Sequence, residues 1–403
     1  MDLRTSIAAA LFALTFLLLA LGRVGRRAIP RGAAALVGGL LTALILQVSW
    51  RAIDIQVLLL LAGLMVLAGL AEASGLFAGI RRHLVKQRPA VALWLSLLLV
   101  ALTSALLLND AAVVVLVPFL LPALMAVGLR PVPSVVLMAV AANIGSLATP
   151  FGNPQNAVLA RAAGLGVVEF LQVQGPIALL GLVLLGAASL WVARQRSDLR
   201  VEVPAHATAR GRPWLVFCIV AFLAGAAVAP QVGVGLGTVA ALAALLAYAG
   251  ARVNLGKAAH GAAWRGLDWN VLALFVGLYL LTGGLRQWVP PAAIPREALA
   301  SALPAGLLTA VLSNLVGNVP AILTLLRLEP AWVVQHAPFL VTVSTLGGAL
   351  LLTGSAASLL AADQARKSGV EVRFVPFLRE AVPWVLPLLV FGAWVTWRLS
   401  AGA

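Results

Sequence analysis

Long apolar runs separated by short charged loops dominate the chain. Runs long enough to cross a bilayer cover 5–22, 31–50, 55–75, 90–127, 132–162, 175–193, 213–229, 235–250, 268–288, 298–327, 336–365 and 381–399. A helix of about 20 apolar residues spans the hydrocarbon core. The runs are continuous and do not alternate, which excludes a β-barrel. The pattern predicts an all-α polytopic membrane protein, with 5–22 as a retained span and not a signal peptide.

Four of these runs have lengths or sequences that do not suit a plain span. Segments 90–127 and 298–327 are too long for one crossing and too short for two, so we expect each to be a re-entrant helical hairpin. Gly, Pro and polar residues interrupt 132–162 and 336–365, so we expect broken helices there. With these assignments about ten transmembrane crossings remain.

The basic residues are distributed unevenly between the two sets of loops. One set, which includes loops near residues 81–88, 194–212 and 252–265, holds roughly three times as many Arg and Lys residues as the other. Such a bias marks the cytoplasmic side. All loops of the basic-rich set lie on one side of the membrane only if both hairpins return to the side from which they enter. It places the 194–212 linker in the cytoplasm and both termini outside.

The two halves of the chain resemble each other. Asp54 opens the run DIQVLLLLAGL and Asp268 opens DWNVLALFVGL, and both aspartates are expected to cap helices. A hairpin and a broken helix follow in the same order in each half. Residues 1–193 and 213–403 are therefore predicted to be inverted repeats joined by 194–212. Inverted repeats with broken helices are typical of secondary transporters.

The composition narrows the classes of function. Apolar residues make up 62%, charged residues 10%, and the mean hydropathy is +1.04. The net charge of +15 lies in short loops and forms no basic face, so nucleic acid is not expected as a partner. A single cysteine, Cys218, and four scattered histidines offer no disulfide or metal cluster. The spans hold no Ser/His or carboxylate pair, which argues against an enzyme.

Polar residues cluster where the hairpins and broken helices are interrupted. The candidate binding residues are Asn109, Asp110, Asn143, Thr149, Gly152, Asn153, Gln155, Asn156, Asn314, Asn318, Thr353, Ser355 and Ser358. Unwound backbone and a carboxylate are costly in hydrocarbon unless a cavity or solute satisfies them. Half-helix N-termini attract anions, whereas free carbonyl and amide oxygens bind small cations.

Each cluster also has a purely structural alternative. Asn109, Asn143 and Asn318 could serve only to bridge helices by hydrogen bonds. Asp110 could serve as a partner for N–H groups at the hairpin tip. Asp363 is expected to form a solvated ion pair with Arg366.

Four motifs resemble the ion-transporter superfamily, and within it the arsenite/antimonite efflux permeases. They are LLLNDAAVVVLVP (106–118), IGSLATPFGNPQN (144–156), SNLVGNVPAIL (313–323) and GGALLLTGSAAS (347–358). The resemblance implies an inverted-repeat permease that moves a small anion or oxyacid by an elevator-like motion, coupled to sodium or protons. It also implies a first ion site at Asn109, Asp110 and Asn153, with sodium at Asn109 and Asn153, and a mirror site at Asn318, Thr353 and Ser355.

Departures from the family pattern shape the leading hypothesis. Leu108, Ala349 and Ser358 replace polar residues of many relatives, which argues against a second cation site. No Arg or Lys is expected near a hairpin tip, which favours a neutral oxyacid such as arsenite. We expect a secondary active transporter in the bacterial plasma membrane, with Asp110 as the coupling carboxylate.

Other functions and assemblies remain open. A sodium-coupled importer of anions or dicarboxylates and a passive anion channel are the alternative functions. No cofactor is expected beyond a coupling ion. No Gly-rich phosphate loop with Lys is present, so an ATP-driven pump would need a separate ATPase subunit. Such a subunit and a homodimer both remain open.

Overall fold

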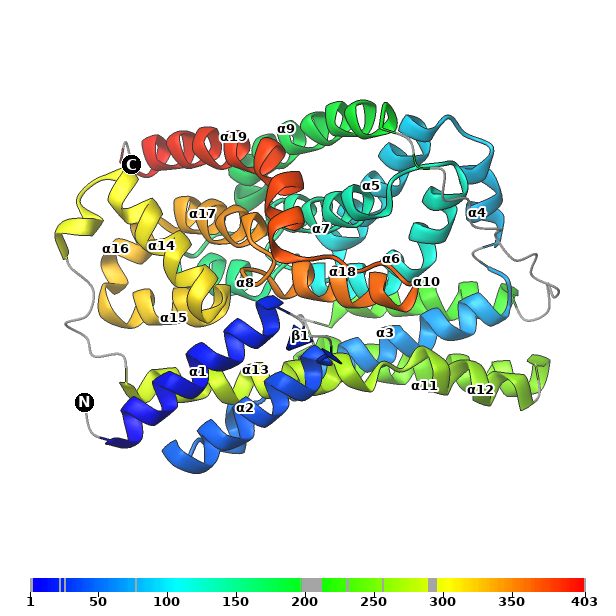
Figure 1. Cartoon of the computed structure of the whole chain (residues 1–403), viewed down its shortest axis with the longest axis horizontal. Helices are drawn as coiled ribbons and strands as arrows, with labels where there is room; N and C mark the ends of the chain where they lie inside the picture. Colours follow the sequence, from blue (N-terminus) through cyan, green and yellow to red (C-terminus); the bar gives the residue numbers. More distant parts are fainter. Residues whose placement is uncertain are drawn as a thin grey trace.

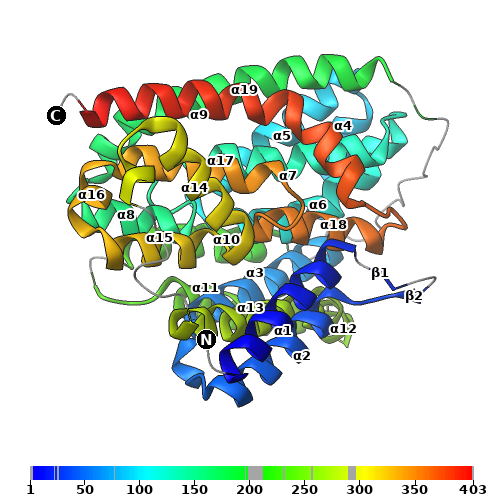
Figure 2. The ribbon, with the colours of Figure 1, turned by 60° about the vertical axis from the view of Figure 1, so that its left-hand side comes forward.

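The fold consists almost entirely of helices arranged in two layers (Figures 1 and 2). The computed structural model describes residues 3–401, apart from 22, 25–26, 77, 196, 198–211, 230–231, 256 and 289–295. Within these residues the strands are the two-residue pair β1 (Arg23–Val24) and β2 (Arg27–Ala28). The predicted all-α class is confirmed. Most of the 194–212 linker lies outside the described residues.

The lower layer in Figure 1 contains the first helices of each half. Its elements are α1 (Leu3–Leu21), α2 (Arg31–Leu46), η1 (Trp50–Ala52), α3 (Ile55–Ala73), α10 (Arg212–Val228), α11 (Leu236–Leu255), α12 (Lys257–Gly266) and α13 (Trp269–Trp288). Helix α2 packs on α13, and α3 packs on α11. Glycines allow this approach: a Cβ on Gly39 would lie 2.5 Å from the Gly277 carbonyl oxygen.

The upper layer contains the hairpins, the broken helices and the two longest helices. The elements from the first half are α4 (Ala78–Val85), α5 (Pro89–Leu106), α6 (Asn109–Ala126), α7 (Pro131–Leu147), α8 (Pro154–Ala162) and α9 (Val167–Ala193). Those from the second half are η3 (Arg296–Leu299), α14 (Ala302–Val316), α15 (Asn318–Leu328), α16 (Pro330–Gln335), α17 (Ala337–Leu350), α18 (Ala356–Lys367) and α19 (Phe374–Ala401). Helices α7 and α17 are buried along nearly their whole length and form the core.

Corresponding elements of the two halves make corresponding contacts in the upper layer. Helix α5 packs on α7 as α14 packs on α17. Across the halves, α6 packs on α18 and α15 packs on α8. Between the layers, α3 against α6 is the one extensive helix packing among the described residues. The two layers therefore meet mainly along one helix pair.

The helix boundaries refine the spans expected from the sequence. Seven described helical segments are long and apolar enough to cross a membrane, and six shorter apolar helices accompany them. Helices α9 and α19 begin at Val167 and Phe374, well before the predicted spans at 175 and 381. Short helices α4, α12 and α16 occupy segments expected to be loops. The number of crossings and the sides of the termini stay predictions.

Two helix caps agree with the sequence, and one ion pair differs. The Asp54 carboxylate accepts hydrogen bonds from the backbone N–H groups of Gln56 and Val57 at 2.9 and 3.3 Å. Asp268 caps α13 in the same way. Asp363 does pair with Arg366, but the expectation of a solvated pair is wrong, because Asp363 is only 4% exposed. It is buried against the lower layer.

Candidate functional site

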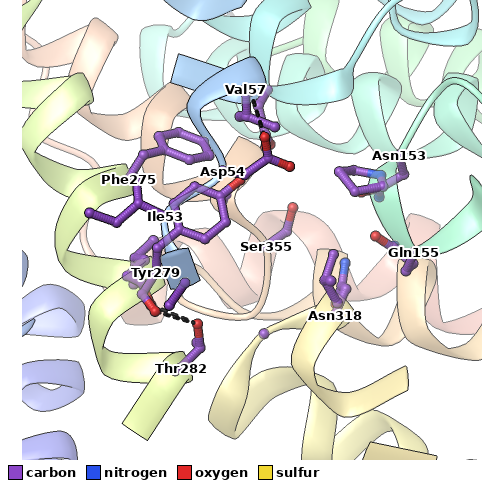
Figure 3. A pocket seen from close by; sticks show the side chains of 18 of the residues that line it. Ile53, Asp54, Val57, Asn153, Gln155, Phe275, Tyr279, Thr282, Asn318 and Ser355 are labelled. Carbon is purple, nitrogen blue, oxygen red and sulfur yellow. Dashed lines mark hydrogen bonds between the residues drawn. The ribbon is translucent and has the colours of Figure 1, made fainter. Parts of the chain in front are cut away.

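A cavity of about 580 Å³ lies between the two layers, where all four predicted helix breaks meet (Figure 3). Hairpin tips contribute Asn109, Asp110, Gly317 and Asn318, and the broken helices contribute Asn153, Gln155, Thr353 and Ser355. Figure 3 shows Asn153, Gln155, Asn318 and Ser355 on one side and Tyr279 and Thr282 of α13 on the other. The structure therefore brings together polar residues that are far apart in the sequence.

Four helices begin at this cavity. Their first residues or caps, Asn109 of α6, Asn153 of α8, Asn318 of α15 and Ser355 of α18, all line it. None of the four N-caps makes a side-chain capping hydrogen bond. First-turn N–H groups carry partial positive charge and have no partner within their own helix. The convergence of these N-termini favours an anion or a polarised oxygen.

The first hairpin is bonded to the unwound part of the first broken helix. The backbone N–H of Asn109 donates to the Gly152 carbonyl at 3.0 Å. Thr149 accepts from the Gly152 N–H at 3.1 Å, and Asn156 donates to the Ser146 and Thr149 carbonyls at 2.8 and 3.2 Å. Thr149, Gly152 and Asn156 therefore build the loop and do not themselves line the cavity.

Asn143 lies behind the cavity and joins the two halves. Its Oδ1 accepts hydrogen bonds from Asn109 Nδ2 at 3.3 Å and from Ser355 Oγ at 3.2 Å. Its Nδ2 donates to the Ala139 carbonyl at 2.9 Å. Asn143 is fully buried. Asn143 of α7 therefore bridges helices by hydrogen bonds, and these bonds position Asn109 and Ser355 at the cavity.

Asp110 lies between two helix N-termini. It belongs to the first turn of α6, and its carboxylate accepts a hydrogen bond from the backbone N–H of Ala357 in the first turn of α18. It is 7% exposed and lines the cavity. Asp110 therefore borders the cavity and satisfies an N–H group of the second broken helix, and its role in ion binding stays a prediction.

The helix breaks of the second half contribute fewer polar side chains to the cavity than those of the first half. Asn314 Nδ2 donates to the carbonyls of Ala310 and Gly347 at 2.7 and 3.0 Å, which holds α14 against α17. A Cβ on Gly354 would lie 1.9 Å from Asn314 Oδ1, so the break in the second broken helix packs tightly there. Asn314 and Ser358 do not line the cavity, whereas Asn318, Thr353 and Ser355 do.

Several buried polar atoms around the cavity have no hydrogen-bond partner among the described residues. They are Asn153 Nδ2, Gln155 Oε1, Asn156 Oδ1, Asn314 Oδ1, Asn318 Oδ1 and Ser358 Oγ. Buried polar atoms in folded proteins are nearly always bonded. Asn153, Gln155 and Asn318 also line the cavity, so three residues with an unpaired buried donor or acceptor border it.

Sequence reasoning missed the lower-layer residues of the cavity. Arg51 lines it, so the expectation of no Arg or Lys near the tips is wrong. Asp54, Phe275, Tyr279 and Thr282 line it as well. A signal was present: the pattern Trp-Arg-x-x-Asp occurs at 50–54 and again at 264–268. Such a recurrence marks equivalent positions in the two halves, although it does not reveal which copy faces the cavity.

Comparisons with known proteins agree with this architecture. The inner membrane protein YbiR of Escherichia coli is 30% identical over 81% of this chain and 84% of its own length. The arsenical pump membrane protein of Escherichia coli is 26% identical over 95% of this chain and 96% of its own. The crystal structure of the Alcanivorax borkumensis YdaH transporter matches 100% of this chain and 99% of that chain, with a TM-score of 0.50 and 16% identity. The family model for citrate transporters (CitMHS) matches residues 16–329, and the chain is therefore a membrane transporter that belongs to this family.

Proposed function

We propose that this transporter is secondary active and moves a small oxyanion or weak oxyacid across the bacterial plasma membrane. The observation that carries the proposal is the convergence on one cavity of four helix N-termini, none of which is capped by the side chain of its own N-cap residue, together with Arg51 in the lining. Donors surround this volume, and such a site suits oxygen atoms that carry negative charge. The similarity to the arsenical pump membrane protein supports a small inorganic solute.

The cavity favours an anion or oxyacid over a cation as the main solute. At each of the four breaks one helix ends and the next begins. The cavity lining includes the N-terminal end of every helix that follows a break, but the helices that precede the breaks contribute only Gly317 from their C-terminal ends. Backbone carbonyl oxygens at helix C-terminal ends are one kind of cation ligand, and few of them border this cavity. Arg51 extends the substrate class to charged oxyanions, which the sequence alone disfavoured.

Asp110 is the proposed coupling residue. Its carboxylate faces the same cavity as the solute, and two negative charges in a shared low-dielectric site destabilise each other. Protonation of Asp110 removes this repulsion, so proton uptake and anion binding support each other. A neutral oxyacid would lack this coupling and would respond less to Asp110.

Sodium coupling is the second candidate. It draws support from Gln155 and Asn318, which line the cavity and whose buried amide oxygens have no partner in the described chain. Such oxygens suit a small hard cation beside the anion. In this case the solute would enter with sodium and would be insensitive to a pH gradient.

Transport by purified protein in vesicles tests these assignments. A thermal-shift panel of arsenite, antimonite, silicic acid, sulfate and citrate, with and without sodium, first identifies the ligand. Flux is then driven by a pH gradient or a sodium gradient, with Asp110→Asn compared with the exposed control Glu371→Gln. We expect uphill, pH-driven flux that Asp110→Asn abolishes. Flux that never exceeds equilibrium would identify a channel, and retained pH-driven flux in Asp110→Asn would refute the coupling role.

A further inference from the structure

The end of α18 that points away from the cavity is fastened to the lower layer by polar side chains. Lys367 Nζ lies 2.6 Å from Asp268 Oδ2, and Gln364 Nε2 donates to the same oxygen at 3.0 Å. Asn270 Nδ2 of α13 donates to Asp363 Oδ2 at 2.8 Å. We call Asp268, Asn270, Asp363, Gln364 and Lys367 the α13–α18 latch.

The latch joins two bodies that otherwise touch little. Extensive helix packing between the layers is confined to α3 and α6 among the described residues. Asp363 and Gln364 are buried in the latch, and the Asn270 amide also accepts from the Gly32 backbone N–H of α2 at 3.0 Å. Any sliding of the upper layer along the lower one must break these bonds.

The latch lies away from the open side of the cavity, farther along α3. The backbone N–H of Asp268 lies 3.2 Å from Met65 Sδ, eleven residues along α3 from Asp54. At 1.5 Å per residue this is about 16 Å. Arg51, Asp54 and Ile55 are exposed and line the cavity, so the cavity reaches the surface at the Asp54 end. The structure is therefore open at Asp54 and closed at Asp268.

The first half contains an aspartate and a basic residue at corresponding places, but they do not form an ion pair in this structure. Trp50-Arg51-x-x-Asp54 corresponds to Trp264-Arg265-x-x-Asp268. Helices α8 and α18 begin at the cavity, extend to opposite sides of it in Figure 1, and end near Gly164 and Gly369, which both have positive φ. Arg161 is the basic residue in the last turn of α8, as Arg366 and Lys367 are in α18. Among the described residues neither Asp54 nor Arg161 forms an ion pair.

We propose that Asp54 and Arg161 form a second latch when the cavity opens toward the Asp268 end, and that the α13–α18 latch breaks in that conformation. Inverted repeats can exchange conformations, so a contact made by one half in one state is made by the other half in the opposite state. The two latches then alternate, and each closes the end at which it forms. This inference rests on the proposed transport by alternating access.

Disulfide trapping tests the proposal without any substrate. In a Cys218→Ser background, Asp268→Cys with Gln364→Cys reports the latch seen here, and Asp54→Cys with Arg161→Cys reports the second latch. Asp54→Cys with Arg366→Cys is the control, because these positions belong to opposite ends. We expect both test pairs to crosslink in membranes and the control pair to remain reduced.

Breaking the observed latch should favour the second one. Lys367→Gln should increase the rate of Asp54–Arg161 crosslinking about fivefold, the size of shift that one partly exposed ion pair can supply. Glu371→Gln is the control for the loss of a charge near the same end of α18, because its exposed ion pair with Arg373 lies within the segment that follows α18. Lys367→Arg retains the charge and should behave as the unaltered chain.

The outcomes separate this inference from the proposed function. Absence of the Asp54–Arg161 crosslink, while the Asp268–Gln364 crosslink forms, would overturn the second latch even if transport is intact. An equal effect of Lys367→Gln and Glu371→Gln would overturn the latch as a determinant of conformation. If Lys367→Gln does not fold, the crosslinks in the otherwise unaltered chain still decide. Crosslinking of both pairs in a chain that transports nothing would leave the latches and refute the transport assignment.

Discussion

The joint at Asn143 gives the most direct test of how the two halves are held together. Asn143→Ala removes one acceptor that serves both Asn109 Nδ2 and Ser355 Oγ. Both donors are buried, at 2% and 3% exposure, and would lose this partner. A buried group left unsatisfied costs about 1–3 kcal/mol. Two such groups should together lower the free energy of unfolding by about 2–6 kcal/mol. We expect the lower end of this range because both residues border the cavity.

Thermal unfolding of the purified protein measures this loss. The exposed residue Asn254 provides a control for the one hydrogen bond of Asn143 that lies within its own helix. Asn254 Nδ2 donates to the Gly250 carbonyl at 2.8 Å, the same four-residue bond that Asn143 makes to Ala139. Asn254→Ala therefore removes that bond without disturbing the joint. Asn143→Ala should unfold at a clearly lower temperature than Asn254→Ala. Equal unfolding temperatures for the two variants would refute the role of Asn143 as a joint between the halves.

Three further predictions concern single contacts. Gly152→Val should destabilise the unwound part of the first broken helix by about 1–3 kcal/mol, because a Cβ there would lie 2.5 Å from the Ser146 carbonyl oxygen; folded yield and unfolding temperature measure it. Asp54→Ala should lower the free energy of unfolding by about 1 kcal/mol through loss of the α3 cap, read by thermal unfolding against Glu371→Gln. Asn153→Ala should reduce the ligand-induced thermal shift more than it reduces the unfolding temperature without ligand, because Asn153 Nδ2 has no partner in the described chain. A lower unfolding temperature without ligand, together with an unchanged ligand-induced shift, would contradict this.

The helix breaks could be predicted from the sequence because residues that unwind a helix are rare within apolar membrane spans. Gly, Pro and amide residues at Gly152 and Gly317 interrupt apolar runs, and unwound backbone in hydrocarbon must be satisfied. The caps at Asp54 and Asp268 followed from the same contrast between a polar residue and an apolar run. These signals are local, so they could be recognised without knowledge of the packing.

Contacts between the layers could not be predicted in the same way. Arg51 looked like a loop residue that orients the protein, but it lines the cavity because η1 packs beside α13 at the cavity wall. Asp363 looked solvated because it lies three residues from Arg366, but Asn270 of the other layer covers it. Both depend on which helices meet, and the hydropathy of Leu- and Ala-rich spans does not determine their partners.

The lengths of α9 and α19 determine how the protein sits in its membrane. With 27 and 28 residues they measure about 40 and 42 Å at 1.5 Å per residue, against a hydrocarbon thickness of about 30 Å. Leu179, Val183 and Leu190 of α9 are exposed, as expected for a face in contact with acyl chains. The two helices must therefore lie oblique to the membrane normal or extend into the headgroups. Thinning or thickening the bilayer would then change the inclination of α9 and α19. Because α7 and α17 pack against these helices, a change in acyl-chain length would also shift the core of the upper layer.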